Sequence, residues 1–117
     1  MSLATLTIGD TFDNPATLSA GQPSEPYNVF TATSIKATIT NEAGTQRYCE
    51  VIELDRSTVG SDWTNGVIVY EFTAEITAQI AEHVTKPELG RIETQVEING
   101  KKYSWSTPIN IRLGNID

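Results

Sequence analysis

Few residues of this chain could carry out nucleophilic or metal chemistry, because it has one histidine, His83, and one cysteine, Cys49. Ser-His-Asp and Cys-His sets both need a histidine beside the nucleophile, so either set would have to converge on His83. This residue falls on the polar side of a predicted helix, where we expect it to be solvated. Cys49 lies in a stretch typical of a strand and is expected to be a small buried hydrophobe. The two are far apart in sequence and predict no zinc site.

Paired carboxylates are the next candidates, because glycoside hydrolysis and calcium binding both depend on them. Asp10 and Asp13 are close in sequence, but the Asp-x-Asp-x-Asp-Gly pattern with a distal glutamate is absent. Glu93 and Glu97 fall on the solvated face of a predicted strand. The chain also lacks a glycine-rich loop of the kind that holds phosphate. The sequence therefore predicts no catalytic residue, no metal site and no cofactor, and we expect a protein that is not an enzyme.

Aromatic residues suggest binding instead of catalysis. Trp63 stands in Ser-Asp-Trp-Thr-Asn-Gly, and a ring among hydrogen-bonding side chains could stack on a sugar or anchor a protein contact. A loop tryptophan that folds back to cap one end of a domain is at least as common, so both interpretations stay open. Phe12 and Tyr27 lie within and directly after a polar, proline-containing segment, residues 9–26. These three aromatic residues are the candidate interaction residues.

Length and charge limit the classes of partner. At 117 residues the chain is expected to bury a single hydrophobic core. Fifteen acidic residues against eight basic ones give a net charge of -7, which disfavours nucleic acid and anionic membranes as partners. A single cysteine allows no disulfide within the chain and favours a reducing compartment. No apolar run approaches the roughly 20 residues needed to cross a bilayer, and no export signal is visible.

The clearest structural signal is Asn99-Gly100, a favoured two-residue type I′ turn in which both residues need a positive φ. With these two residues as the loop, Val96 is predicted opposite Tyr103 on an apolar face. Trp105 shares that face and is expected in the core. The other face carries polar pairs: Glu97 with Lys102, Gln95 with Ser104, and Glu93 with Ser106. This alternation predicts a half-buried antiparallel hairpin.

The rest of the chain shows further strand patterns and one helix pattern. Apolar residues indicate strands near 5–8, 35–40, 48–54 and 67–72. Thr73 is expected to cap a helix of about three turns. Its apolar stripe is Ile76, Ile80 and Val84. Pro108 interrupts the last strand, and because proline cannot donate to a ladder it indicates an edge or a bulge.

These elements together predict an all-β fold, an immunoglobulin-like antiparallel β-sandwich of about seven strands with one short helix. We expect residues 1–26 to form an N-terminal strand and an extended arm, and residues 27–117 to form the sandwich. A long segment without structure of its own is uncommon inside a compact domain. The arm at 9–26 is therefore the first place to look for a partner.

The second half of the chain resembles the immunoglobulin-like domains of tailed-bacteriophage virion proteins. The resemblance rests on Val-Ile-Val-Tyr-Glu-Phe-Thr-Ala-Glu-Ile-Thr-Ala at residues 67–78, a following glycine, the strand Ile-Glu-Thr-Gln-Val-Glu-Ile, then Asn-Gly-Lys and a closing strand. It covers roughly residues 35–116 and is similar to the N-terminal domain of phage baseplate upper proteins, and to head-fibre and capsid-decoration proteins. Ile92 departs from the pattern, which often has an aromatic residue there, and the arm is not part of it.

The resemblance implies a structural role in a virion, without catalytic residues. We expect a baseplate, tail or head-decoration module that docks to other virion proteins, forms a homo-oligomer and is assembled in the host cytoplasm. The alternative is a carbohydrate-binding adhesion module, with a glycan as partner and Trp63 as the stacking platform.

Overall fold

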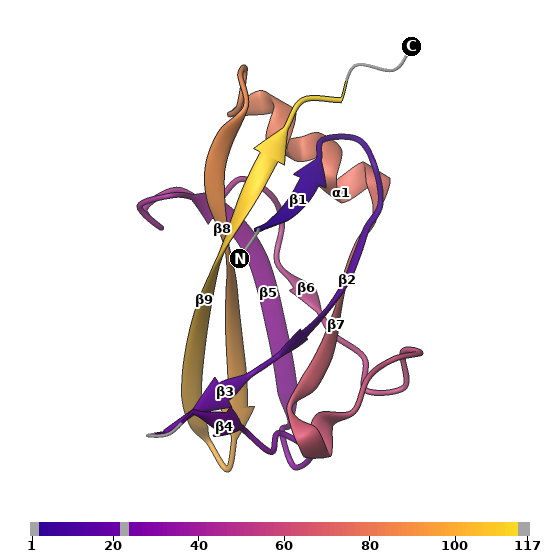
Figure 1. Ribbon diagram of the computed structural model, residues 1–117, viewed down its shortest axis with the longest axis vertical. Helices are drawn as coiled ribbons and strands as arrows, with labels where there is room; N and C mark the ends of the chain where they lie inside the picture. The colour runs from indigo at the N-terminus through magenta and orange to yellow at the C-terminus, as the bar shows by residue number, and fades with distance from the viewer. Residues whose placement is uncertain (1–2, 22–23, 115–117) are drawn as a thin grey trace.

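The computed structural model describes residues 3–21 and 24–114, which Figure 1 shows as a mostly β arrangement. The strands are β1 (Ala4–Thr7), β2 (Phe12–Thr17), β3 (Ser19–Ala20), β4 (Glu25–Pro26), β5 (Ser34–Asn41), β6 (Ile52–Glu53), β7 (Val67–Phe72), β8 (Glu88–Ile98) and β9 (Lys101–Arg112). The helical segments are α1 (Ala74–Ala78) and two 3₁₀ turns, η1 (Trp63–Asn65) and η2 (Gln79–Glu82). The prediction of a β-rich chain with one short helix is confirmed.

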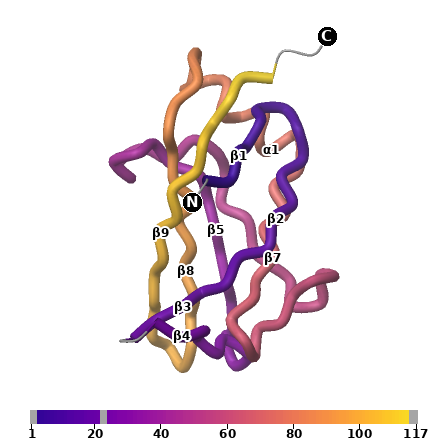
Figure 2. Tube along the Cα trace, in the orientation of Figure 1, coloured from indigo at the N-terminus to yellow at the C-terminus, as the bar shows by residue number. Residues whose placement is uncertain are grey.

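The strands form two facing layers. Five of them make one curled sheet in the order β1-β9-β8-β5-β6, and β2 pairs with β7 in a separate two-stranded sheet. β1 runs parallel to β9, whereas the other pairs are antiparallel. Figure 2 shows β2 and β7 side by side along one flank of the molecule, with the small β3–β4 hairpin crossing the lower end of β8 and β9.

The β8–β9 hairpin has the register that the sequence predicts. Asn99 and Gly100 form its loop with φ values of 52° and 78°, as a type I′ turn requires. Val96 lies opposite Tyr103, and the polar pairs of the other face are also as expected. Local turn chemistry is therefore sufficient to set this register.

Residues 9–26, predicted as an arm or long loop, instead contain the strands β2, β3 and β4. Phe12 to Thr17 form β2, which pairs along its whole length with β7. Pro15 lies opposite Val69 in β2, which has a neighbouring strand on one side only. Such an edge strand tolerates proline because the missing N–H can fall on the unpaired side. The turn before β2 is fixed by the buried Thr77 of α1, whose Oγ1 accepts a hydrogen bond from Gly9 N–H at 3.0 Å. Residues 22–23 lie outside the described part of the chain.

The helix begins where the sequence predicts and is shorter than expected. The Thr73 hydroxyl oxygen accepts a hydrogen bond from the Ile76 N–H at 3.3 Å, which confirms the N-cap. α1 then runs for five residues and continues as the 3₁₀ turn η2. Of the predicted stripe, Ile80 and Val84 are buried and Ile76 is partly buried.

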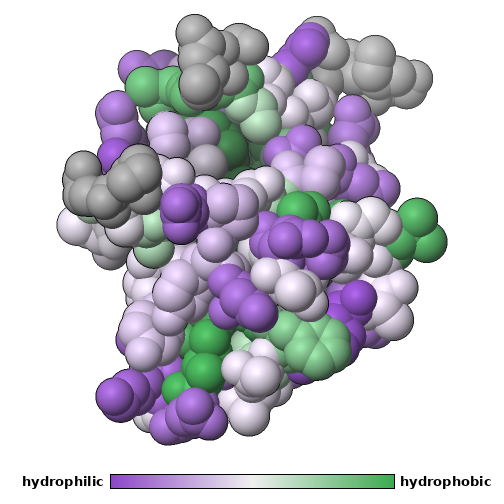
Figure 3. Space-filling view, turned by 60° about the horizontal axis from the view of Figure 1, so that its bottom comes forward, coloured by the Kyte–Doolittle hydropathy of each residue, from purple (hydrophilic) through white to green (hydrophobic). Residues whose placement is uncertain are grey.

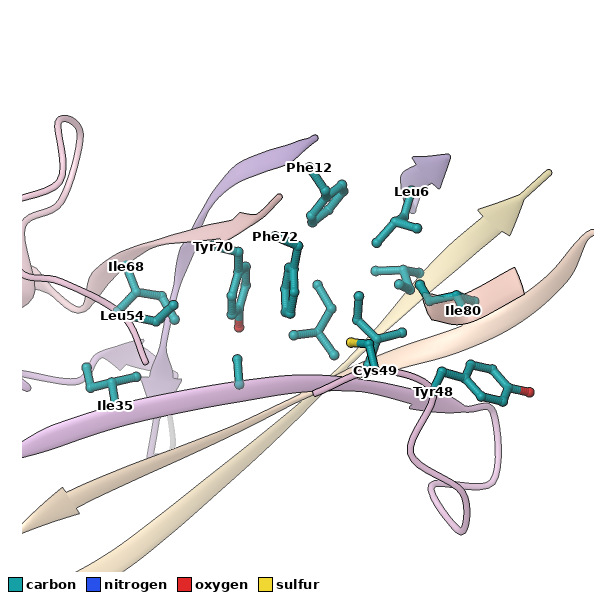
Figure 4. Packing of buried hydrophobic residues seen from close by; sticks show 14 of the residues in the cluster. Leu6, Phe12, Ile35, Tyr48, Cys49, Leu54, Ile68, Tyr70, Phe72 and Ile80 are labelled. Atoms are coloured by element: carbon teal, nitrogen blue, oxygen red, sulfur yellow. The ribbon is translucent and has the colours of Figure 1, made fainter. Parts of the chain in front are cut away.

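The core fills the space between the two layers, as Figure 4 shows. Tyr70 and Phe72 of β7 point toward the five-stranded sheet, and their stacked rings have centroids 6.1 Å apart. The Tyr70 hydroxyl and Thr94 Oγ1 are hydrogen-bonded at 2.6 Å, so both buried polar atoms are satisfied. Trp105, which the sequence placed in the core, only packs against it and stays half-buried, because the neighbours that contact its ring are the short strand β3, through Ser19, and Tyr27.

Candidate docking site at the free edge of the sheet

β9 has a strand on both sides only along its upper half. β8 pairs with it from Lys101 to Arg112, whereas β1 pairs only with residues 109–112. On the side away from β8, residues 101–107 therefore have no neighbouring strand within the described part of the chain. We call this stretch the β9 edge, and it runs down to the hairpin turn in Figure 1.

The alternation of an antiparallel ladder decides which backbone groups of the β9 edge are free. In a two-residue hairpin the residues flanking the turn, Ile98 and Lys101, exchange hydrogen bonds, so the odd-numbered residues of β9 bond to β8. The even-numbered ones face away from β8, as shown by the Arg112 carbonyl, which accepts a hydrogen bond from the Ile8 N–H at 3.0 Å. Within residues 3–21 and 24–114, three residues of the edge therefore have N–H and C=O groups without a strand partner: Lys102, Ser104 and Ser106.

Pro108 separates the paired half of β9 from the β9 edge. It is even-numbered, so its missing N–H falls on the side away from β8 and costs the hairpin no hydrogen bond. Of the two alternatives that the sequence predicts for Pro108, an edge or a bulge, the structure shows the edge, because β1 pairs with β9 only from Ile109 onward.

An aromatic cluster lies beside the β9 edge, formed by Tyr27, Tyr103 and Trp105. The Tyr27 ring centroid is 5.9 Å from that of Tyr103 and 5.5 Å from that of Trp105. The Trp105 Nε1–H donates a hydrogen bond to the Ser19 carbonyl at 2.9 Å, which satisfies the polar atom of the ring. Tyr103 remains 37% exposed, so part of the cluster is open to a docked chain.

The backbone of Tyr27 is held by a close approach of Gly66, the residue after η1. The Tyr27 N–H donates to the Leu18 carbonyl at 2.8 Å. Gly66 has a φ of 74°, and a Cβ at this position would lie 2.7 Å from the Leu18 oxygen and 2.8 Å from the Tyr27 oxygen. Only glycine fits both the conformation and the space, so the Tyr27 backbone can lie this close because residue 66 has no side chain.

The β9 edge is basic in a strongly acidic protein. The chain has a net charge of -7, yet residues 101–113 contain no acidic residue. Lys101 and Lys102 are exposed at the lower end of the edge, and Lys102 lies opposite Glu97 across the hairpin. In Figure 3, which brings the lower end forward, the visible face shows separate hydrophobic patches among hydrophilic side chains. The edge therefore combines free backbone groups, exposed aromatic surface and positive charge.

The three candidate interaction residues lie in different places. Phe12 is 7% exposed and packs on Phe72, with ring centroids 6.3 Å apart. Trp63 is 5% exposed, and the Arg56 guanidinium carbon lies 4.6 Å from its ring centroid. Trp63 is therefore buried, as the capping interpretation expects. Tyr27 alone is partly accessible, as a member of the aromatic cluster.

Sequence reasoning missed Tyr103 and Trp105 as members of this site. Their alternation correctly placed both on the inner face of the hairpin, but alternation does not show how far the opposite layer reaches. The polar residues around the Asn99-Gly100 turn and the lysines that follow were the available signal that this end of the strand is less covered.

Cys49 and His83, the residues considered for nucleophilic or metal chemistry, pack against other side chains of the fold. Cys49 is buried as expected, and this burial raises the pKa of its thiol. The His83 ring stacks on that of Tyr48, with centroids 5.4 Å apart. The Tyr48 hydroxyl donates to Glu88 Oε2 at 2.7 Å, and burial, this hydrogen bond and the carboxylate charge raise the pKa of Tyr48 to about 12. Within residues 3–21 and 24–114, no group of three or more His, Cys, Asp or Glu side chains is arranged to hold a metal ion.

Comparison with known proteins identifies no relative: no protein-family model matches this chain, and no curated protein matches it. None of the helices in the described residues has the length and apolar character needed to cross a membrane.

Proposed function

We propose that this chain is a non-enzymatic structural protein of a tailed-bacteriophage virion, built as an immunoglobulin-like domain, which docks to other virion proteins through the β9 edge. The observation that carries the docking function is the set of free backbone groups on Lys102, Ser104 and Ser106. An extended segment can add a strand to such an edge, with its backbone supplying affinity and the neighbouring side chains supplying specificity. The exposed part of Tyr103 offers apolar surface beside that strand.

The strand order supports the immunoglobulin-like interpretation. An immunoglobulin sandwich sets strands C, F and G in one sheet and strands A, B, E and D in the other. With the β3–β4 hairpin set aside, β5, β8 and β9 take the places of C, F and G and share a sheet, while β2 and β7 take those of B and E. β6 flanks β5 as C′ flanks C in variable-type domains. β1 departs from the simple pattern, because it pairs with β9.

The family resemblance supports the virion assignment. It spans β5 to β9, which are the elements that form the docking edge and the hairpin. A docking role also agrees with the charge of -7, which opposes association with nucleic acid. Such a role requires a stable sandwich with an accessible strand edge.

The test is co-sedimentation of the purified chain with tailed-phage particles that lack it. These particles are assembled by the phage whose genome carries the gene for this chain, after that gene has been deleted. We expect the wild type and Ser104→Ala to pellet with the particles and Ser104→Pro to stay in the supernatant. The Ser104 N–H faces away from β8, so proline removes a donor that only a docked strand would use. Ser104→Ala is the matched control because it keeps that N–H.

Two results would overturn the proposal. If the wild type does not pellet with particles, and mass spectrometry finds no trace of it in native virions, the virion role is wrong. If Ser104→Pro binds particles as well as the wild type, docking at the β9 edge is wrong.

A further inference from the structure

The five-stranded sheet has a second free edge, and its charge is opposite to that of the β9 edge. We propose that the β9 edge of one copy of this chain binds the β6 edge of a second copy, so that copies assemble head to tail. This inference rests on the proposed function, because it names the occupant of the β9 edge.

The β6 edge is the stretch of residues 50–55 on the side of β6 away from β5. The Leu54 N–H donates to the Ile35 carbonyl at 2.8 Å, so Leu54 faces β5 and its neighbour Glu53 faces away. By the same alternation Val51 faces away, and 42% of its surface is exposed. No strand pairs with this side of β6 in the described part of the chain. Among the described residues, the outward N–H and C=O groups of Val51 and Glu53 therefore have no strand partner, whereas the Glu50 N–H donates to Gln79 Oε1 at 2.9 Å and the Asp55 carbonyl accepts from the Thr58 N–H at 3.1 Å.

The two edges are complementary in charge. The β6 edge carries three exposed carboxylates and no basic residue: Glu50, Glu53 and Asp55. The Ser57 N–H and hydroxyl both donate to Asp55 Oδ1 at 2.8 Å, and these bonds hold the pKa of Asp55 below its usual value, so it stays ionised at neutral pH. Facing them, the β9 edge carries Lys101 and Lys102. Complementary charge of this kind selects the partner edge and its orientation more than it adds affinity.

The free stretches of the two edges lie at the same level of the sheet. Glu53 is opposite Lys36, Lys36 is opposite Gln95, and Gln95 is opposite Ser104, so one row of residues crosses the sheet from edge to edge. A second copy placed beside the first, without displacement along the strands, brings its Glu53 to Ser104. Steric conflict with β1 is avoided, because β1 covers only the other half of β9.

Strand direction and register also fit. β6 and β8 are both antiparallel to β5, and β9 is antiparallel to β8, so β6 and β9 run in opposite directions. Pairing Ser104 with Glu53 in an antiparallel ladder joins the free backbone groups of both edges. It also sets Ser106 opposite Val51 and brings Lys102 beside Asp55.

This contact is heterologous, because each copy uses two different surfaces. Such contacts give a closed ring when the rotation between copies closes and an open filament when it does not. The competing arrangement is a symmetric dimer in which two β9 edges pair with each other. It would leave the acidic β6 edges without a partner and gains nothing from the charge difference between the edges.

The test is sedimentation velocity of the purified full chain from about 1 μM to about 1 mM, the range in which a weak pair forms. The edge variants are Lys102→Glu, Glu53→Lys and the double variant that carries both. Lys86→Glu is the control matched to Lys102→Glu, because it makes the same charge change at an exposed residue that belongs to neither edge. Far-ultraviolet circular dichroism and a thermal midpoint close to that of the wild type show that each variant is folded.

We expect the wild type and Lys86→Glu to self-associate, and each single edge variant to weaken that association by about tenfold or more. The double variant is expected to recover it, because the charges are exchanged and remain complementary. Raising the salt concentration to about 0.5 M should weaken wild-type association, since it screens the charge attraction between exposed groups.

The remaining outcomes separate this inference from the proposed function. A wild type that stays monomeric throughout while binding phage particles overturns head-to-tail assembly and leaves the virion role intact. Association that Lys102→Glu weakens and Glu53→Lys leaves unchanged also overturns it, in favour of the symmetric dimer. Charge-dependent self-association with no binding to particles supports this inference and overturns the virion role.

Discussion

The two halves of β9 behave as different structures although they belong to one strand. The upper half, residues 109–112, has a strand on both sides and buries Ile109 and Ile111 in the same cluster as Leu6. The lower half, the β9 edge, has a strand on one side, and Tyr103 on its inner face is 37% exposed. The same alternation of side chains therefore serves folding where neighbours cover it and remains available for binding where they do not.

This contrast shows that the lower half of β9 is the half with space for an added strand. Strand edges that stay open are a risk for aggregation, and proteins commonly limit them with lysine, proline and short strands. The β9 edge has Lys101 and Lys102 at one end and Pro108 at the other. An edge bounded in this way accepts a short added strand and resists uncontrolled extension.

Truncating one side chain in each half should give the largest difference. We expect Ile109→Ala to lower the free energy of unfolding by about 2–5 kcal/mol, because it leaves a cavity in the core. Tyr103→Ala, at a partly exposed position, should cost about 1 kcal/mol. Urea unfolding followed by circular dichroism measures both values. Equal losses would mean that the lower half is also part of the folding core.

Removing the Tyr70 hydroxyl tests whether the sheet is still covered at Thr94, the residue opposite the half-buried Trp105. Thr94 lies opposite Trp105 and is buried, with its hydroxyl bonded to that of Tyr70. Tyr70→Phe leaves Thr94 Oγ1 unsatisfied and should cost about 1–3 kcal/mol of unfolding free energy. Adding Thr94→Val should recover part of this loss, because no unpaired polar atom remains. A double variant less stable than Tyr70→Phe alone would argue against this account.

Two neighbouring proline substitutions test which backbone groups of the β9 edge are free. The Tyr103 N–H bonds to β8, whereas the Ser104 N–H faces the open side. We expect Tyr103→Pro to be less stable than Tyr103→Ala by at least about 1 kcal/mol, because it loses a ladder hydrogen bond. Ser104→Pro, compared with Ser104→Ala, should lose clearly less in the same urea titration. The reverse order would place the free groups on the odd-numbered residues.

The smallest effect is expected at alkaline pH, in the covered region. Glu88, opposite Ile111, accepts the hydrogen bond from the Tyr48 hydroxyl, and the pKa of Tyr48 is raised from 10.0 to about 12. Between these values the unfolded chain has lost this proton and the native chain keeps it, so stability falls as pH rises. Thermal midpoints at a series of pH values across this window should fall more steeply for the wild type than for Tyr48→Phe. Parallel slopes would exclude Tyr48 as the cause.

Much of the fold could be predicted because it depends on residues close in sequence. Asn99-Gly100 can form a type I′ turn whatever surrounds it, and the turn then fixes every pair in the hairpin. Thr73 caps α1 through a bond to a residue three positions later. Pro108 marks an edge because of a property of its own backbone, the missing N–H.

What the sequence did not predict depends on contacts between distant segments. Residues 12–17 form a strand because β7 supplies their partners some fifty-five residues later, although their polar, proline-containing sequence is typical of a loop. Trp63 and Trp105 differ in the same way: the first is buried under Arg56, and the second is only half covered. Periodicity assigns a side chain to a face of a strand and carries no information about the layer opposite that face.

By itself, then, the sequence determined the β-rich class, the register of the β8–β9 hairpin and the start of the helix. It also determined that Pro108 has no N–H to donate to a neighbouring strand. The tertiary structure alone decided where β1 stops along β9, which strand ends each layer, and how a basic and an acidic edge come to lie on one row of residues. The physical reason is that turns, caps and alternation act over a few bonds of chain, whereas the covering of an edge depends on which remote segment packs against it.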